Sequence, residues 1–158
     1  MNHPAELAVF EYLGKAIKGE TDMAEDIRKQ VASDVEAALE KQFGGKPRDE
    51  FRLRMSNIGR PTCQLWFEKN DPEDKTPLPP HFLINMIIGD IVEAVFKGLL
   101  RAAEVDFKDN DSVTLKLKDG TEINGEYDMV LDGKVDDVKS ASPWSYKNKF
   151  NTLDIQFI

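Results

Sequence analysis

Two Asp-Gly turns divide the last third of this chain into short segments, and this pattern constrains the fold more than any other feature of the sequence. Asp119-Gly120 and Asp132-Gly133 each follow a segment in which apolar and polar residues alternate. Alternation with a period of two is typical of strands, and Asp-Gly between two such segments favours a tight hairpin. We therefore predict three strands joined by hairpins, over residues 113–118, 122–131 and 134–139.

The first two-thirds of the chain has the apolar spacing of helices instead. Apolar residues recur every three or four positions, which predicts helices over residues 5–17 and 22–42 and a long apolar helix over residues 81–103. Asp22 is a suitable N-cap for the second of these helices. A shorter helix is expected to begin near Pro61. The side chains expected to be buried on this short helix are Cys63, Leu65, Trp66 and Phe67.

Composition narrows the classes of protein that fit. A chain of 158 residues suits one domain. No apolar run is long enough to cross a membrane, the N-terminus lacks a signal-peptide pattern, and the single cysteine excludes an internal disulfide framework. We expect a cytoplasmic protein with no membrane partner. The net charge of −8 argues against non-specific adhesion to nucleic acid, although a carboxylate site that holds a divalent ion can still meet a phosphate.

Acid-x-lysine triplets are a weak motif that needs context. About three are expected by chance from this composition. The chain has four, at Glu73/Lys75, Asp106/Lys108, Asp132/Lys134 and Asp137/Lys139. Only the last is placed within a predicted strand, where the period of two puts both charged side chains on one face and turns Val138 toward the core. The alternative interpretation is an exposed, salt-bridged hairpin.

Two further carboxylates fall near the last triplet. Asp128 lies on the preceding strand, and the hairpin is expected to bring it beside Asp137, where the two carboxylates repel each other unless a cation lies between them. Glu93 sits among apolar residues of the long predicted helix, where an ionised side chain is costly unless it is paired or solvated, and a metal would satisfy it. Oxygen ligands alone suit a hard ion such as Mg²⁺ or Mn²⁺.

Three motifs resemble the PD-(D/E)xK nuclease superfamily, in particular the small RecB-like exonucleases carried by phages. The strongest match is the hairpin, which reads INGEYDMVLDGKVDDVKSAS over residues 123–142. A helix motif with the family pattern Gly-x-x-x-His/Glu reads GDIVE over residues 89–93. An early segment with a serine, a short loop and a Cys/Leu/Trp helix reads SNIGRPTCQLWFEK over residues 56–69. The resemblance covers about residues 54–150.

The resemblance implies a restriction-endonuclease-like α/β core, with a mixed sheet flanked by helices. Residues 1–158 would form a single nuclease domain, in which residues 1–50 are a helical extension and residues 51–158 the core. Relatives carry a helix with a glutamine and a tyrosine after the lysine strand. Residues 153–158 match that helix poorly, so the resemblance leaves open whether the core is truncated at its C-terminus.

The resemblance also implies a Mg²⁺ or Mn²⁺ site formed by Glu93, Asp128, Asp137 and the backbone carbonyl of Val138. Lys139 would orient or deprotonate the attacking water. Phosphodiester hydrolysis needs an activated water and a neutralised phosphate oxygen, which a divalent ion supplies. Relatives with an iron–sulfur cluster use four cysteines, so no such cluster is expected here.

Contacts to DNA are expected on both sides of the hairpin in sequence. Gln64 stands where the family often has a basic residue, so the phosphate contacts fall to other side chains. Trp144 and Tyr146 are aromatic candidates for stacking on single-stranded DNA. The candidate DNA-binding residues are Arg54, Ser56, Arg60, Trp144, Tyr146, Lys147 and Lys149. His3 and His81 lack ligand-like spacing with the acids and receive no role.

The leading interpretation is a metal-dependent deoxyribonuclease, an exonuclease that acts on DNA ends or single strands in phage recombination or DNA degradation. A structure-specific endonuclease with the same chemistry is one alternative, and a catalytically inactive DNA-binding or assembly module is another. DNA would be the main partner, and a recombination or replication protein would be a possible second partner. If a phage encodes the protein, it would act in the host cytoplasm. Strand preference, polarity, oligomeric state and the number of metal ions stay open.

Overall fold

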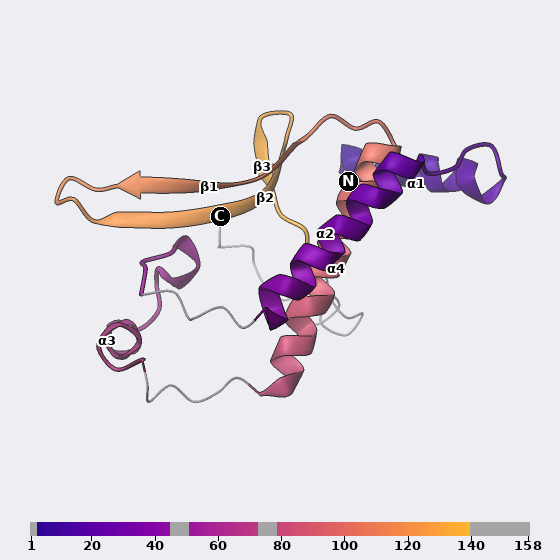
Figure 1. Cartoon of the computed structure of the whole chain (residues 1–158). Coiled ribbons are helices and arrows are strands. Elements are labelled where there is room, and N and C mark those ends of the chain that lie inside the picture. The colour runs from indigo at the N-terminus through magenta and orange to yellow at the C-terminus, as the bar shows by residue number, and fades with distance from the viewer. Residues whose placement is uncertain (1–2, 45–50, 73–78, 140–158) are drawn as a thin grey trace, which may run out of the picture.

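The computed structural model describes residues 3–44, 51–72 and 79–139, which form helices and a three-stranded antiparallel sheet (Figure 1). The helices are α1 (Pro4–Ile17), α2 (Glu25–Phe43), α3 (Thr62–Asn70) and α4 (Pro80–Ala102), with a short 3₁₀ helix, η1, over Met55–Asn57. The strands are β1 (Lys108–Lys116), β2 (Glu122–Leu131) and β3 (Lys134–Asp136), and they keep this order across the sheet. The general α/β class is confirmed, but the strands of the described sheet pair antiparallel and do not form the expected mixed sheet.

The long helices form where the apolar spacing predicted them, with shifts at their ends. α1 begins at Pro4 after His3, whose Nδ1 accepts a hydrogen bond from the Ala5 backbone N–H at 3.3 Å. Proline suits this position because the first turn of a helix leaves its N–H groups without helical partners. The expectation that Asp22 caps α2 is wrong, because α2 begins later, with Ala24 at the N-cap position.

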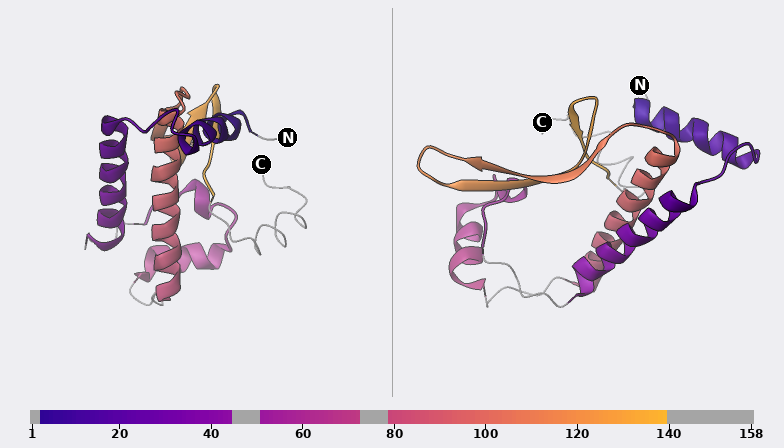
Figure 2. Two further views of the ribbon diagram at one scale, coloured as in Figure 1. Left: turned by 90° about the vertical axis from the view of Figure 1, so that its right-hand side faces the viewer. Right: turned by 45° about the horizontal axis from the view of Figure 1, so that its top comes forward.

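α2 and α4 lie side by side and form the helical body of the molecule (Figures 1 and 2). A Cβ atom at Gly98 would lie 2.2 Å from Cγ2 of Val31, so glycine allows α4 its close approach to α2. Nearer the start of α4, the Gln42 side chain donates a hydrogen bond to Asp90 at 2.7 Å. Apolar contact and polar pairing together fix the position of α4.

The buried core lies where α1, the end of α4 and β2 meet. Leu100 of α4 and Met129 of β2 are 0% and 1% exposed, the lowest values among the described side chains of this core. The other buried members are Ala5, Val9 and Leu131. Val138 packs against this cluster, which confirms the prediction that its side chain turns toward the core. The core therefore anchors both sides of the hairpin that carries the last acid-x-lysine triplet.

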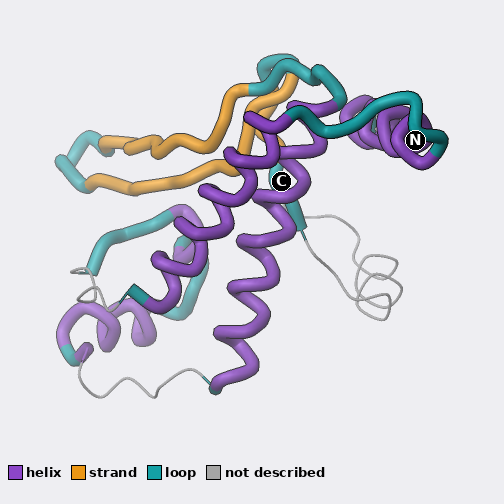
Figure 3. Tube along the Cα trace, turned by 45° about the vertical axis from the view of Figure 1, so that its right-hand side comes forward, coloured by secondary structure: helices purple, strands orange, loops and turns teal. Residues whose placement is uncertain are grey.

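The β1–β2 hairpin projects away from the α2–α4 body (Figure 3). Every residue of β1 is exposed. β1 begins at Lys108, earlier than the predicted residue 113. The turn into β3 is the predicted one, since Asp132 and Gly133 have φ values of 48° and 76°, the left-handed pair of a type I′ turn. β3 ends at Asp136, so the prediction that the following aspartate and lysine lie within a strand is wrong.

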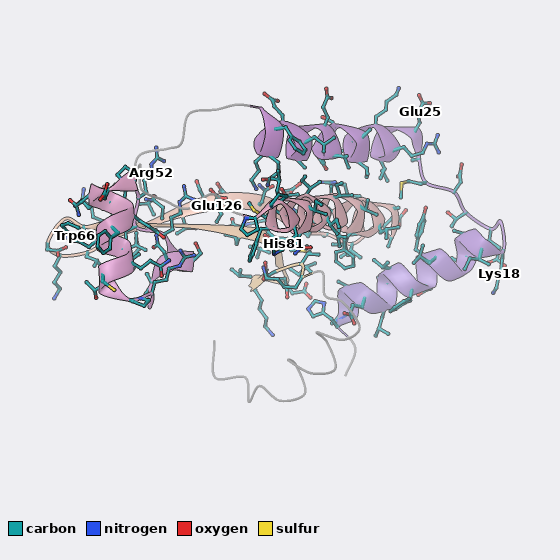
Figure 4. All side chains as sticks on the ribbon, turned by 90° about the horizontal axis from the view of Figure 1, so that it is seen from below. Lys18, Glu25, Arg52, Trp66, His81 and Glu126 are labelled. Carbon is teal, nitrogen blue, oxygen red and sulfur yellow. The ribbon has the colours of Figure 1, made fainter. Side chains whose placement is uncertain are left out.

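α3 lies apart from the α2–α4 body; Figure 4 shows Trp66 on α3, at a distance from α4, which begins near His81. The expectation that α3 buries its side chains is wrong: Trp66 is 58% exposed, Phe67 57%, and Cys63 is exposed, while Leu65 is half-buried. No described element covers this helix, so its apolar residues reach solvent. The segment before α3 is nevertheless attached to the sheet, as described below.

Candidate functional site

The β2–β3 hairpin brings Asp128 and Asp137 together. The last pair of the ladder is Met129 with Asp136, so the residues one step beyond it on each strand are Asp128 and Asp137. Their carboxyl groups lie close enough to share a proton when one of them is protonated. The predicted neighbourhood of these two aspartates is thus present, although β3 ends before it reaches Asp137.

The pKa of Asp128 is raised to about 6. Burial is the main cause, followed by the hydrogen bond with Asp137, and the charges of Glu93 and Asp137 act in the same direction. The backbone N–H of Val138 donates to Asp128 Oδ2 at 2.8 Å and opposes the rise, because this hydrogen bond favours the ionised form. Asp128 is therefore the member of the pair that holds the shared proton.

Asp137 responds in the opposite direction. Burial disfavours its charge, but hydrogen bonds from Asp128 and Lys139 outweigh burial and lower the pKa of Asp137. The Lys139 Nζ lies 2.7 Å from Oδ1 and 2.6 Å from Oδ2 of Asp137. The Lys139 side chain is 72% exposed, so the ammonium group stays accessible to a substrate while it contacts the carboxylate. An ionised carboxylate, a carboxyl group that holds a proton below about pH 6, and a lysine thus occupy one edge of the hairpin.

Glu93 is paired with a lysine, one of the ways in which its charge was expected to be satisfied, and its role as a metal ligand stays a prediction. Lys97, one helical turn further along α4, places its Nζ 2.7 Å from Glu93 Oε1 and 2.8 Å from Oδ1 of Asp109 in β1. Burial disfavours the charge of Lys97, but these two hydrogen bonds outweigh it and raise the pKa of Lys97. Burial likewise disfavours the charge of Asp109, but hydrogen bonds from Lys97 and the Asn110 backbone, with the charge of Arg101, lower the pKa of Asp109. Glu93 nonetheless lies close enough to Asp128 for its charge to raise the pKa of that group.

Of the three carboxylates predicted to bind the metal, only Asp128 and Asp137 are in contact with each other, whereas Glu93 is paired with Lys97. Among the described residues, no three side chains of the acidic, histidine or cysteine type converge closely enough to hold a metal ion. The donor chemistry of Asp128 and Asp137 still fits a hard cation, because two carboxyl groups in contact need either a shared proton or a positive charge between them. Glu93 is the adjacent carboxylate that would complete the set by moving from Lys97.

A cleft of about 410 Å³ opens beside Asp137 and Lys139, and residues of both α1 and α4 line it. His3 and Asp136 also line this cleft, with His3 Nε2 3.6 Å from Asp136 Oδ1. No sequence pattern assigned His3 to this site, because only the packing of α1 on the core brings His3 to the hairpin. Its place before Pro4 signals a helix start and nothing more.

The early segment meets the sheet at the other end of β2. The Asn124 backbone N–H donates to the Leu53 carbonyl at 2.9 Å, and Arg54 forms a single parallel bridge with Asn124. Ser56 follows within η1 and is exposed, and Arg60 is 3.3 Å from Glu68 of α3. Trp144, Tyr146, Lys147 and Lys149 lie outside the described residues. The DNA-binding assignments thus remain predictions.

In the described parts of the chain, no helix combines the length and the apolar character needed to span a membrane. Comparisons with known proteins add no relative: no family model, no curated protein and no solved structure matches this chain.

Proposed function

We propose that this protein is a Mg²⁺- or Mn²⁺-dependent deoxyribonuclease of the PD-(D/E)xK type, and that it acts as an exonuclease on DNA ends or single strands. The observation that carries the proposal is the contact of Asp128 with Asp137, with Lys139 hydrogen-bonded to the latter. Perturbed carboxyl groups of this kind, at the edge of a cleft, are more frequent at catalytic sites than on ordinary surfaces.

The proposed roles follow from the chemistry of each group. Asp128 and Asp137 would bind the ion, which supplies positive charge to the scissile phosphate and acidifies a water molecule when bound. Lys139 would hold the attacking water, since its ammonium is exposed and is fixed by Asp137 at hydrogen-bond distance. Glu93 would add a third carboxylate from α4. The proton that Asp128 shares with Asp137 would leave when the ion binds.

The test is cleavage of four DNA substrates, circular and linear, single-stranded and double-stranded, with chelator, with Mg²⁺ and with Mn²⁺. An exonuclease degrades the linear forms and spares the circles, whereas an endonuclease cuts circles as well. Cleavage should require added metal. Purified protein that leaves all four substrates intact at saturating Mn²⁺ would contradict the catalytic proposal and favour a DNA-binding or assembly module.

The chain offers a matched control for the lysine. Lys139→Ala should lower the cleavage rate at least about 100-fold, as expected for loss of a group that handles the water's proton. Lys134→Ala removes the exposed lysine of the Asp132/Lys134 triplet on the same hairpin and should leave the rate near that of the wild type. Equal rates for the two variants would remove Lys139 from the mechanism. Because Lys139 is exposed, its variant should also melt close to the wild type.

A further inference from the structure

Lys97 is unusual because it is a charged side chain inside the fold. At 4% exposure it is the only Lys, Arg, Asp or Glu side chain classed as buried within the described ranges. Buried ammonium groups are tolerated when they are paired, and Lys97 is paired twice, with Glu93 and with Asp109. Those partners belong to α4 and β1, so Lys97 ties the third candidate carboxylate to the strand that flanks β2.

The two partners place Glu93 on a different side of the site from Asp137. Glu93, Lys97 and Asp109 line a groove between α2, α4 and β1. Asp137 and Lys139 line the cleft beside α1. The bond from Lys97 to Glu93 Oε1, at 2.7 Å, therefore holds this carboxylate toward the groove. Any ion bound by Asp128 and Asp137 has to compete with Lys97 for Glu93.

We propose that Lys97 is a positioning residue that restrains Glu93 and thereby weakens the binding of a divalent cation by the carboxylates. This inference rests on the proposed metal site and deepens it. Lys97 keeps Asp109 as a partner when Glu93 leaves, so release of Glu93 does not leave a buried ammonium alone. The protein can thus hold the carboxylates in place without an ion and recruit the third one when an ion is present.

The experiment is calorimetric titration with Mn²⁺ of three purified full-length proteins, the wild type, Lys97→Met and Arg101→Met. Methionine keeps the apolar stem of the lysine and removes its charge. The dissociation constant for Mn²⁺ should fall about tenfold in Lys97→Met, equivalent to about 1.4 kcal/mol. Arg101 is the matched control: it contacts Asp109 and Asp34 from the next turn of α4 and has no bond with Glu93. Arg101→Met should change the constant by less than about twofold.

A double-mutant cycle separates restraint of Glu93 from a general effect of charge. In a Glu93→Gln background the Lys97→Met change should no longer tighten Mn²⁺ binding, because the carboxylate that Lys97 restrains is gone. A gain that persists in that background, or a Lys97→Met protein that binds Mn²⁺ no more tightly than the wild type, would overturn the inference. If Lys97→Met does not fold, Lys97→Gln, which keeps a donor for Asp109, takes its place with the same expected direction.

The outcomes also distinguish this inference from the proposed function. If the wild type binds Mn²⁺ through Asp128 and Asp137 and Lys97→Met binds it no more tightly, the proposed metal site is supported and the proposed role of Lys97 is wrong. If none of the proteins binds Mn²⁺, both fail together. A gain confined to Lys97→Met supports both, and so does a site that becomes measurable only in that variant.

Discussion

Two ionisable clusters lie at or beside the central strand β2, and they differ in how their charges are satisfied. The Lys97 network, formed by Glu93, Lys97, Asp109, Arg101 and Asp34, alternates acids and bases, and each charge in it meets an opposite one. The carboxyl pair, Asp128 and Asp137, brings like groups together and needs a shared proton. The first arrangement holds elements in place, whereas the second stores repulsion that a cation would relieve.

The largest effect is expected from breaking the Lys97 network. Lys97→Met should lower the free energy of unfolding by about 2–3 kcal/mol, because two partly buried carboxylates lose their common partner. Arg101→Met should cost only about 1 kcal/mol, since its side chain and partners are more exposed. Denaturant unfolding in chelator measures both values. Similar losses for the two variants would show that burial of Lys97 does not distinguish it within the network.

The next effect concerns Mn²⁺ and the carboxyl pair. At Mn²⁺ a hundredfold above its dissociation constant, the wild type should gain about 2.7 kcal/mol of stability. Asp137→Asn keeps the shape of the side chain and removes a charge, so the variant should be at least as stable as the wild type in chelator and should lose this gain. Asp132→Asn, in the turn of the same hairpin, is the control and should keep it. Thermal melts with chelator and with Mn²⁺ measure the difference.

The smallest effect is a pH dependence of stability that comes from Asp128. Its pKa rises on folding from 3.8 to about 6, so between these values the folded chain holds a proton that the unfolded chain has lost. The contribution of Asp128 is therefore fully present below about pH 4 and is lost as the pH rises through about 6. The lowered pKa of Asp137 acts in the opposite sense at more acidic pH. Asp128→Asn should flatten the fall in the free energy of unfolding between pH 4 and 7. Urea unfolding in chelator at several pH values measures this fall. The same dependence on pH in the variant and the wild type would contradict the shared proton.

Local patterns account for what was predicted correctly. The period of two and the Asp-Gly turn gave the β2–β3 hairpin, and this turn fixes the register that puts Asp128 opposite Asp137. The apolar spacing gave α1, α2 and α4 within a few residues. Each of these features depends on residues close together in sequence, where steric preferences of the backbone and apolar periodicity act directly.

The errors concern contacts between distant parts of the chain. The apolar side chains of α3 predicted burial of Trp66 and Phe67, but apolar character does not show whether another element covers a helix. The role of Lys97 was missed because an i,i+4 acid–lysine pair is ordinary on a helix surface, and its burial depends on β1. His3 reached the cleft only through the packing of α1 on the core.

The sequence alone determined the hairpin, its register and the pairing of Asp128 with Asp137, because a two-residue turn leaves neighbouring strands no other alignment. Only the tertiary structure decided that Lys97, the i,i+4 partner of Glu93, is buried and has a second partner on the sheet. The Lys97 ammonium contacts Glu93 one turn earlier on α4 and Asp109 on β1. The physical reason is that a buried ammonium is costly unless it is paired and hydrogen-bonded, and the fold supplies a second acceptor from β1, the strand that follows α4.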